Sequence, residues 1–211
     1  MKKATLSPFI LLSSLAFLAI MPTCVAAPQL PQSAPGLERS SFSQALFLKA
    51  RQSVGGEMWK PGYGLSKGTL GCAAALCNVL KASGNRSVNS AMVTVARRQL
   101  LAAPNHCREV VIRNGEGKVI SDAILVKNCQ PGDILLAFME PPTKLNGGPN
   151  AHCGIMGEGT KVFTNNWLNG IWTEVDVHQM FDYYPYVRLL QFSPVLSDRK
   201  DVKMGRLRGR R

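Results

Sequence analysis

The sequence predicts an α+β domain in which helices pack on one face of an antiparallel β-sheet. Up to about residue 102, apolar residues recur three or four positions apart, the spacing that places side chains on one face of a helix. From about residue 107, apolar residues alternate with polar ones or form short runs between turn residues, which is typical of strands. A chain whose helices come first and whose strands follow is expected to segregate them in this way.

Helices are expected in the first part of the chain. Ser41 is the expected cap of the first helix, and Gly55–Gly56 is expected to end it. After a loop rich in glycine and proline, Thr69 is the expected N-cap of a second helix, which carries Cys72 in its first turn and ends near Gly84. The expected helices cover about 42–54, 70–83 and 90–102.

Strands are expected in the second part. The stretch CREVVIRNGEGKVISDAILV, residues 107–126, predicts two strands around a glycine-containing turn. A short helix is expected near 177–184. The other expected strands lie within 132–139, 151–165 (a hairpin), 170–176 and 186–192.

The two ends of the chain differ from the domain between them. Lys2 and Lys3 precede an apolar run that ends in small residues near Ala26 and Ala27, which is the pattern of a secretory signal peptide. We therefore expect an exported protein, either periplasmic or extracellular. The predicted segments are a signal peptide (1–27), a linker (28–40), one domain (41–196) and a basic tail (197–211).

The charge of the chain suggests the kind of partner. The formal net charge is +12, and the last fourteen residues contain seven Lys or Arg. Such a run could hold the protein on an anionic surface, either a cell-wall polymer or lipid head groups. The tail has no aromatic residue to stack on bases, so nucleic acid is not an expected partner. We expect the protein to be a monomer.

The cysteines are interpreted in the light of export. An odd number remains after cleavage, so at least one thiol is unpaired in an oxidising compartment. Cys107 and Cys129 flank the expected hairpin of 107–126 and are the expected disulfide. A zinc site is the alternative, because His106 adjoins Cys107 and His152 adjoins Cys153, but no Cys-x-x-Cys spacing occurs. We therefore expect no metal and no cofactor.

Cys72 is the candidate nucleophile. A cysteine in the first turn of a helix is favoured as thiolate by the unpaired N–H groups and the positive helix end. His152 is the candidate base, since it begins a strand and shares a face with Gly154, which would leave room for a substrate. The structural alternative is a histidine that only packs at a strand start. His106 and His178 are the other histidines of the chain.

A serine nucleophile is the competing interpretation. Ser66 lies in GLSKG, which matches the G-x-S-x-G pattern. That pattern needs a buried strand before the serine and a helix directly after it. Because proline and glycines precede Ser66, the glycines are better explained as shaping a loop beside a cleft.

Three blocks of the chain together resemble a known family. LGCAAALCNVL, PGDILLAF and AHCGIMGEGTKVFTNN, within residues 55–191, are similar to the ordered motifs of NlpC-type cell-wall cysteine peptidases and the related CHAP amidases. The resemblance implies a papain-like core, with Cys72 as nucleophile and His152 as base. A polar residue on the next strand, Asn165 or Asn166, would orient the imidazole, and Asn165 is favoured.

The chain departs from the family pattern at two places. Gly71 and Ala73 flank the cysteine where the family usually has Asp and Ser, and Tyr63 is only a loose counterpart of the family's upstream tyrosine. Asp133 matches the family's Gly-Asp position and is expected to bond to backbone at a strand start.

The sequence therefore predicts an exported cysteine hydrolase that cleaves an amide bond in the peptide stems of peptidoglycan. Two alternatives stay open. The same scaffold could serve an acyltransferase, or an amidase for a lipid or small molecule. It could also be a wall-binding module without catalytic activity.

Overall fold

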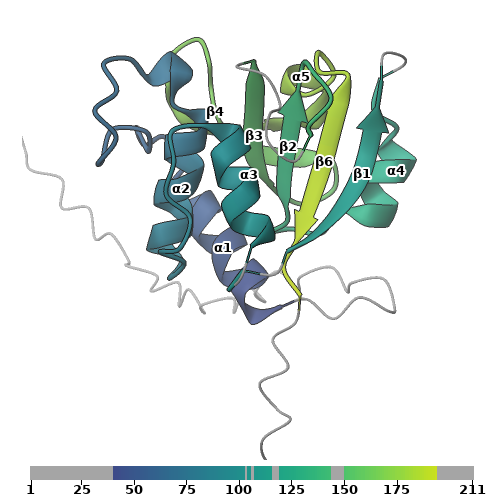
Figure 1. The fold of residues 1–211 in the computed structure, drawn as a ribbon, viewed down its shortest axis with the longest axis horizontal. Coiled ribbons are helices and arrows are strands. Elements are labelled where there is room, and N and C mark those ends of the chain that lie inside the picture. Colours follow the sequence, from purple (N-terminus) through teal and green to yellow (C-terminus); the bar gives the residue numbers. More distant parts are fainter. Residues whose placement is uncertain (1–39, 103, 106, 116–118, 144–149, 194–211) are drawn as a thin grey trace, which may run out of the picture. The chain divides into compact units, whose positions relative to one another are not determined.

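An antiparallel sheet forms the centre of the protein. The structure is a computed structural model that describes residues 40–102, 104–105, 107–115, 119–143 and 150–193. The strand order is β1-β6-β2-β3-β4-β5, and all neighbours are antiparallel (Figure 1). The strands are β1 (Arg108–Asn114), β2 (Ile134–Phe138), β3 (Ala151–Met156), β4 (Lys161–Asn165), β5 (Trp172–Asp176) and β6 (Tyr186–Gln191).

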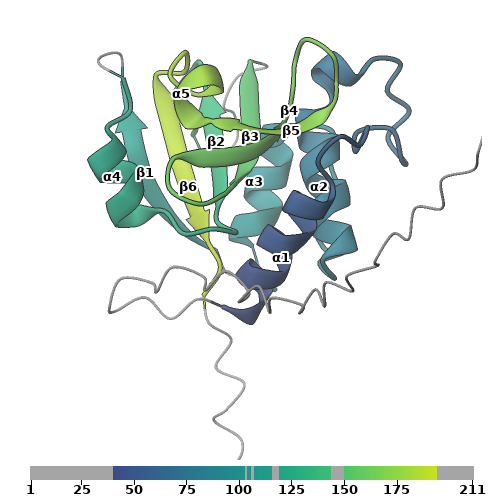
Figure 2. The same ribbon diagram turned by 180° about the vertical axis from the view of Figure 1, so that it is seen from behind.

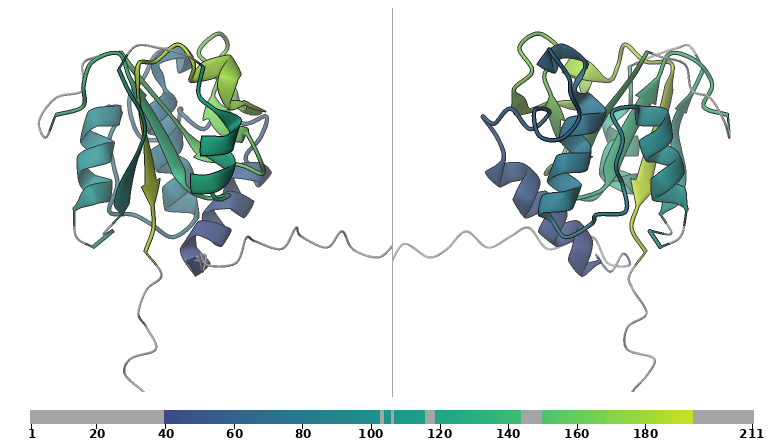
Figure 3. Two further views of the ribbon diagram at one scale, coloured as in Figure 1. Left: turned by 90° about the vertical axis from the view of Figure 1, so that its right-hand side faces the viewer. Right: turned by 60° about the vertical axis from the view of Figure 1, so that its left-hand side comes forward.

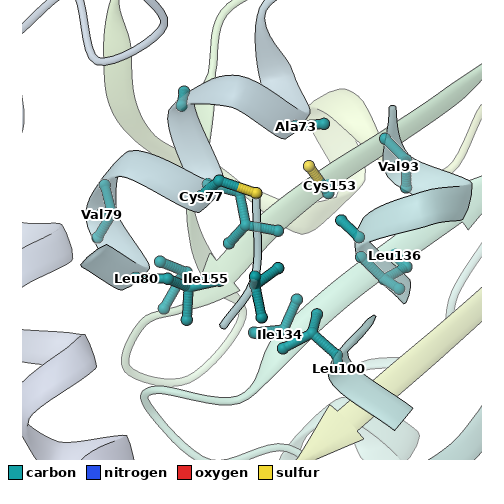
Figure 4. Close-up of a cluster of buried hydrophobic side chains, with 14 of the residues drawn as sticks. Ala73, Cys77, Val79, Leu80, Val93, Leu100, Ile134, Leu136, Cys153 and Ile155 are labelled. Atoms are coloured by element: carbon teal, nitrogen blue, oxygen red, sulfur yellow. The ribbon is translucent and has the colours of Figure 1, made fainter. Parts of the chain in front are cut away.

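The helices predicted in the first part of the chain pack on one face of this sheet. They are α1 (Ser41–Gln52), α2 (Cys72–Ala82) and α3 (Val93–Leu101), and each contacts β3. Side chains of these helices meet Ile134, Leu136 and Phe138 of β2 in one apolar core (Figure 4). The hydroxyl of Ser40 accepts the Ser43 N–H at 3.0 Å, so Ser40 caps α1, one residue before the predicted cap.

The opposite face of the sheet is also covered. Two short helices, α4 (Asp122–Asn128) and α5 (Val177–Met180), lie on this side (Figures 2 and 3). Leu125 and Phe181 pack there against Leu135 and Ala137 of β2. Because successive residues of a strand point to opposite faces, β2 is buried along its whole length. The α+β class is confirmed, whereas the expectation that helices cover one face alone is not.

The hairpin predicted for residues 107–126 is wrong in its second half. β1 pairs with β6, and the chain then enters α4. The β-branched residues after position 118 suggested a strand, but Asp122 lies in the first turn of a helix, where a negative charge is favourable. Leu125 becomes fully buried in the second core. Tertiary burial thus decides between two local patterns.

The predicted Cys107–Cys129 disulfide is not formed in the structure. Both residues are free thiols. Burial, with a smaller effect of nearby Asp133, raises the pKa of each thiol to about 12. The predicted signal peptide (1–27) and basic tail (197–211) lie outside the described residues, as does the predicted linker apart from Ser40. None of the helices among the described residues is long and apolar enough to cross a membrane.

Candidate active site

Cys72 is the first residue of α2. Thr69 does not cap this helix as predicted, because Gly68–Leu70 forms a 3-10 turn and Gly71 is the N-cap. A side chain is sterically excluded at Gly71, where an added Cβ would lie 2.3 Å from Cβ of Trp59. The helix therefore begins without a capping side chain, and its first N–H groups remain for the thiol or a substrate.

Strand β3 lies against this helix start and carries His152. The Cys72 sulfur is 3.8 Å from the carbonyl oxygen of Ala151, the residue before His152. His152 is buried, with 3 % of its surface exposed. The space beside Gly154 is filled, since an added Cβ would lie 2.6 Å from Cγ2 of Val162 and 3.2 Å from Cβ of Thr164. Gly154 thus makes room for β4 rather than for a substrate.

Thr164 of β4 determines how the His152 imidazole is protonated. Its Oγ1 lies 2.8 Å from Nε2 of His152, and the same hydroxyl donates to the Cys153 carbonyl at 2.7 Å. A hydroxyl has a single proton, so Oγ1 can only accept from His152. Nε2 must therefore carry a hydrogen, and Nδ1 is left with the lone pair. Nδ1 is then the nitrogen available to the thiol of Cys72.

The surroundings of Cys72 favour its thiolate form. A hydrogen bond from the Cys153 thiol lowers the pKa of Cys72 well below its ordinary value, and the contact with His152 and the Ala73 N–H act in the same direction. Partial burial opposes these effects without overcoming them. The pKa of Cys153 is raised by burial and by the neighbouring Cys72. Cys153 therefore remains a thiol, able to donate to the thiolate.

An aromatic wall surrounds the imidazole. The ring centroids of Trp167 and Phe181 lie 5.4 and 5.3 Å from that of His152. Tyr184 stacks on His152 at 6.2 Å, with 6° between the ring planes. Burial and the charge of Cys72 raise the pKa of Tyr184, which keeps its hydroxyl protonated. These contacts hold the imidazole in one orientation and limit its contact with water.

The two asparagines predicted to orient His152 have other partners. The Asn165 side chain is buried and donates from Nδ2 to the carbonyl of Gly68 at 2.7 Å. Oδ1 of Asn166 accepts the Leu168 N–H at 2.8 Å in the loop after β4. The imidazole donates its Nε2 hydrogen bond instead to the hydroxyl of Thr164, one position earlier. Asn165 supports the 3-10 turn that leads to Cys72.

The other residues selected from the sequence lie away from this site. Asp133 accepts the Gln130 N–H at 2.9 Å, the backbone contact predicted for it. Tyr63 donates to Asn89 at 2.7 Å and is not part of the cleft lining. Ser66 is exposed.

His178 does not compete with His152 as the base. His178 is held by the carboxylates of Asp122 and Asp182 at 2.6 and 2.8 Å. His106 lies outside the described residues. Within the described part of the chain, no group of three or more His, Cys, Asp or Glu side chains is placed to hold a metal ion.

Sequence reasoning missed Thr164, Cys153 and the aromatic wall. Thr164 could have been considered, because strand alternation places it, like Asn166, on one face of the sheet. The resemblance indicated an amide as the partner of the imidazole, whereas the structure uses the hydroxyl of Thr164 in VFTN. The aromatic residues come from separate loops after β4 and α5, so no local pattern joins them.

A cleft of about 630 Å³ opens at Cys72 and His152. Its walls come from the starts of α2 and α3, the end of β2, the start of β3, and the loops with Trp167 and Tyr184. A buried histidine that keeps Nδ1 free beside a low-pKa thiol can activate a nucleophile and then protonate a leaving group.

Neither the models of known protein families nor the curated proteins match this chain.

Proposed function

We propose that the protein is an exported cysteine hydrolase that cleaves amide bonds, with Cys72 as nucleophile and His152 as acid and base. The observation that carries the proposal is the Thr164–His152 contact. It fixes the imidazole tautomer whose lone pair is on Nδ1, beside a thiol whose pKa is lowered. A histidine that only packs at a strand start would need neither feature.

The reaction follows from these positions. The Cys72 thiolate attacks the amide carbonyl, and the Cys72 backbone N–H at the helix start is a donor for the developing oxyanion. The protonated His152 gives the Nδ1 proton to the leaving amine as the C–N bond breaks. Water then loses a proton to Nδ1 and attacks the thioester, which releases the acid and the free thiol. Throughout these steps the hydroxyl of Thr164 accepts a hydrogen bond from the Nε2–H of His152.

Peptidoglycan stem peptides are the proposed natural substrate. The net charge of +12 supports this choice, because it favours association with a polymer rich in carboxylates. An acyltransferase would share the first half of the mechanism and differ in the acceptor that takes the acyl group. A papain-like arrangement of the core is part of the same proposal and is supported by the order of helix cysteine, strand histidine and following polar strand residue.

Digestion of purified peptidoglycan tests the proposal. The wild-type protein is expected to release fragments with new amino and carboxyl ends, identified by mass spectrometry. Cys72→Ala and His152→Ala should each abolish release, and the double variant should lose no more than either one, because the two residues act as a unit. Ser66→Ala is the matched control and should keep full activity. Equal release by the wild type and Cys72→Ala would refute the mechanism.

A thiol-reactive probe separates an enzyme from a wall-binding module. The enzyme should contain one fast-reacting cysteine, and peptide mapping should place the label on Cys72. A protein that binds cell wall without such a cysteine would be the non-catalytic module.

A further inference from the structure

The cleft at Cys72 has an uncharged lining. Apart from the Cys72–His152 pair, the polar side-chain groups of the lining residues that the structure describes are hydroxyls, one amide and the indole N–H of Trp167. None of these described lining residues is Asp, Glu, Lys or Arg. The rest of the lining is aliphatic, aromatic or methionine. The apolar residues nearest the starts of α2 and α3 are Leu65, Leu70, Ala91, Met92 and Val93.

Large apolar side chains are exposed at the mouth of the same cleft. Leu70 is 77 % exposed, Met92 is 58 % exposed and Tyr183 is 71 % exposed. All three line the cleft. Leu70 lies two residues before the nucleophile, and Met92 is the N-cap of α3. Apolar residues gathered around a concave site mark a surface that binds an apolar group.

This lining is a poor match for a charged substrate. A carboxylate or ammonium group that enters the cleft loses water, and beyond the Cys72–His152 pair it finds no described lining residue of opposite charge, which is costly. An aliphatic group loses only unfavourable contact with water. The positive net charge of the protein therefore does not come from the described residues that line the cleft.

From these observations we propose that the cleft takes an aliphatic acyl chain, and that the substrate is an N-acylated compound whose amide joins this chain to an amine. The inference rests on the proposed cysteine hydrolase and departs from a peptidoglycan stem peptide as its substrate, because it gives the cleft an aliphatic acyl group. Cys72 forms a thioester with the chain as the C–N bond breaks, and the amine leaves with the proton from His152. Water then cleaves the thioester and releases a fatty acid.

A series of p-nitrophenyl esters tests the acyl preference. Acetate, butyrate, hexanoate and octanoate differ only in chain length, and release of p-nitrophenol is measured as kcat/KM. If each methylene is fully buried in the transition state, kcat/KM should rise about fourfold per methylene. An ester of octanoate length that ends in a carboxylate is the matched charged probe, and it should react no faster than acetate.

Two surface variants connect the preference to the cleft. Met92→Glu places a charge at the mouth and should lower the octanoate-to-acetate ratio of kcat/KM at least tenfold. Val126→Glu makes the same exchange on α4, where Val126 is 68 % exposed and not part of the lining, and should leave the ratio unchanged. Circular dichroism melting curves establish that both variants fold.

Intact-mass measurement of the trapped acyl-enzyme separates the two hypotheses. Acylation of Cys72 by every ester, without a rise in kcat/KM along the series, would overturn the aliphatic preference and leave the cysteine hydrolase standing. Equal ratios in Met92→Glu and the wild type would overturn it as well. Absence of a Cys72 adduct with every ester would overturn the hydrolase and the preference together.

Discussion

Oγ1 of Thr164 lies 2.8 Å from Nε2 of His152 and donates its own proton to the Cys153 carbonyl. Because the only hydrogen of this hydroxyl is donated to the backbone, the hydroxyl oxygen acts as the acceptor in its contact with His152. An asparagine amide would hold the ring with a carbonyl oxygen, and here a hydroxyl oxygen makes the same neutral contact. Thr164 is therefore a positioning residue that acts through His152.

Replacement of this hydroxyl should slow turnover without abolishing it. Thr164→Val keeps the shape of the side chain and removes the acceptor for Nε2–H, so the imidazole can adopt the other tautomer. We expect kcat to fall about 10- to 100-fold, which is on the order of 1.4 to 2.7 kcal/mol. Thr164→Ser, which keeps the hydroxyl, should restore most of the activity. The measurement is steady-state hydrolysis of an activated ester with both variants.

Asn166→Ala is the control for this strand, because Asn166 bonds within the following loop. Unchanged kcat is expected for it. If Thr164→Val and Thr164→Ser lose activity equally, the effect comes from packing and not from the hydrogen bond.

Asn165 should matter for stability more than for chemistry. Its amide donates to the carbonyl of Gly68, which is buried in the 3-10 turn before Cys72. Asn165→Ala removes one of two hydrogen bonds to that carbonyl, which keeps the bond from the Gly71 N–H at 2.9 Å. Loss of one hydrogen bond typically costs about 0.5–1.5 kcal/mol. Urea unfolding should show this loss. A fall in kcat larger than that of Thr164→Val, at unchanged stability, would restore the orienting role favoured from the sequence.

Much of the fold could be predicted because the pattern and the environment agree. β3 and β4 form a hairpin whose short apolar runs are flanked by glycine, and tertiary packing reinforces the same strands. Residues 119–126 show the opposite case. Their β-branched side chains favour a strand, and only burial of Leu125 under β2 and β6 makes the helix the better solution. Such burial depends on distant segments and cannot be deduced from local spacing.

The candidate site could also be predicted in part. Cys72 and His152 are placed by their own elements, a helix start and a strand, so local pattern was sufficient to find them. The role of Thr164 depends on the pairing of β3 with β4. It also depends on whether its hydroxyl proton goes to the Cys153 carbonyl or to Nε2 of His152. The effect of Cys153 on Cys72 cannot be deduced from local spacing, because this contact crosses from β3 to α2.

Cys153 should tune the reactivity of Cys72. Its thiol donates to the Cys72 thiolate, and this hydrogen bond is the largest cause of the lowered pKa. Without the donor, the pKa of Cys72 should rise. In Cys153→Ala the pH at which alkylation of Cys72 by iodoacetamide reaches half its maximal rate should move upward. Rates at pH 6 should fall, while rates at high pH should stay close to those of the wild type.

Cys77→Ala is the matched control. Cys77 is also a buried thiol, in the core between the sheet and helices α1 to α3 (Figure 4). It donates to the Ser90 carbonyl at 3.4 Å. Both variants remove one buried sulfur, so both should lose some stability, but the alkylation profile should move in Cys153→Ala alone. Equal profiles in the two variants would show that the Cys153 thiol has no effect on the nucleophile.

His178 should make stability depend on pH. Its Nε2 lies 2.6 Å from Asp122 of α4 and its Nδ1 lies 2.8 Å from Asp182, while Asp176 is 4.0 Å away. The hydrogen bond with Asp122, followed by that with Asp182, raises the pKa of His178 above its ordinary 6.5, although partial burial opposes this. The folded protein therefore holds this proton more tightly than the unfolded chain.

This difference in proton binding determines whether stability rises or falls with pH. A histidine whose pKa is raised in the folded state stabilises it fully below about pH 6.5, and this contribution is lost as the pH rises through the folded-state pKa. Urea unfolding of Cys72→Ala, which removes the titration of the nucleophile, should show stability that falls between about pH 6 and 8. His178→Gln in the same background keeps a hydrogen-bonding side chain without the charge, and its stability should fall less over this range. If both proteins show the same dependence on pH, the contact between α4 and α5 does not depend on the charge of His178.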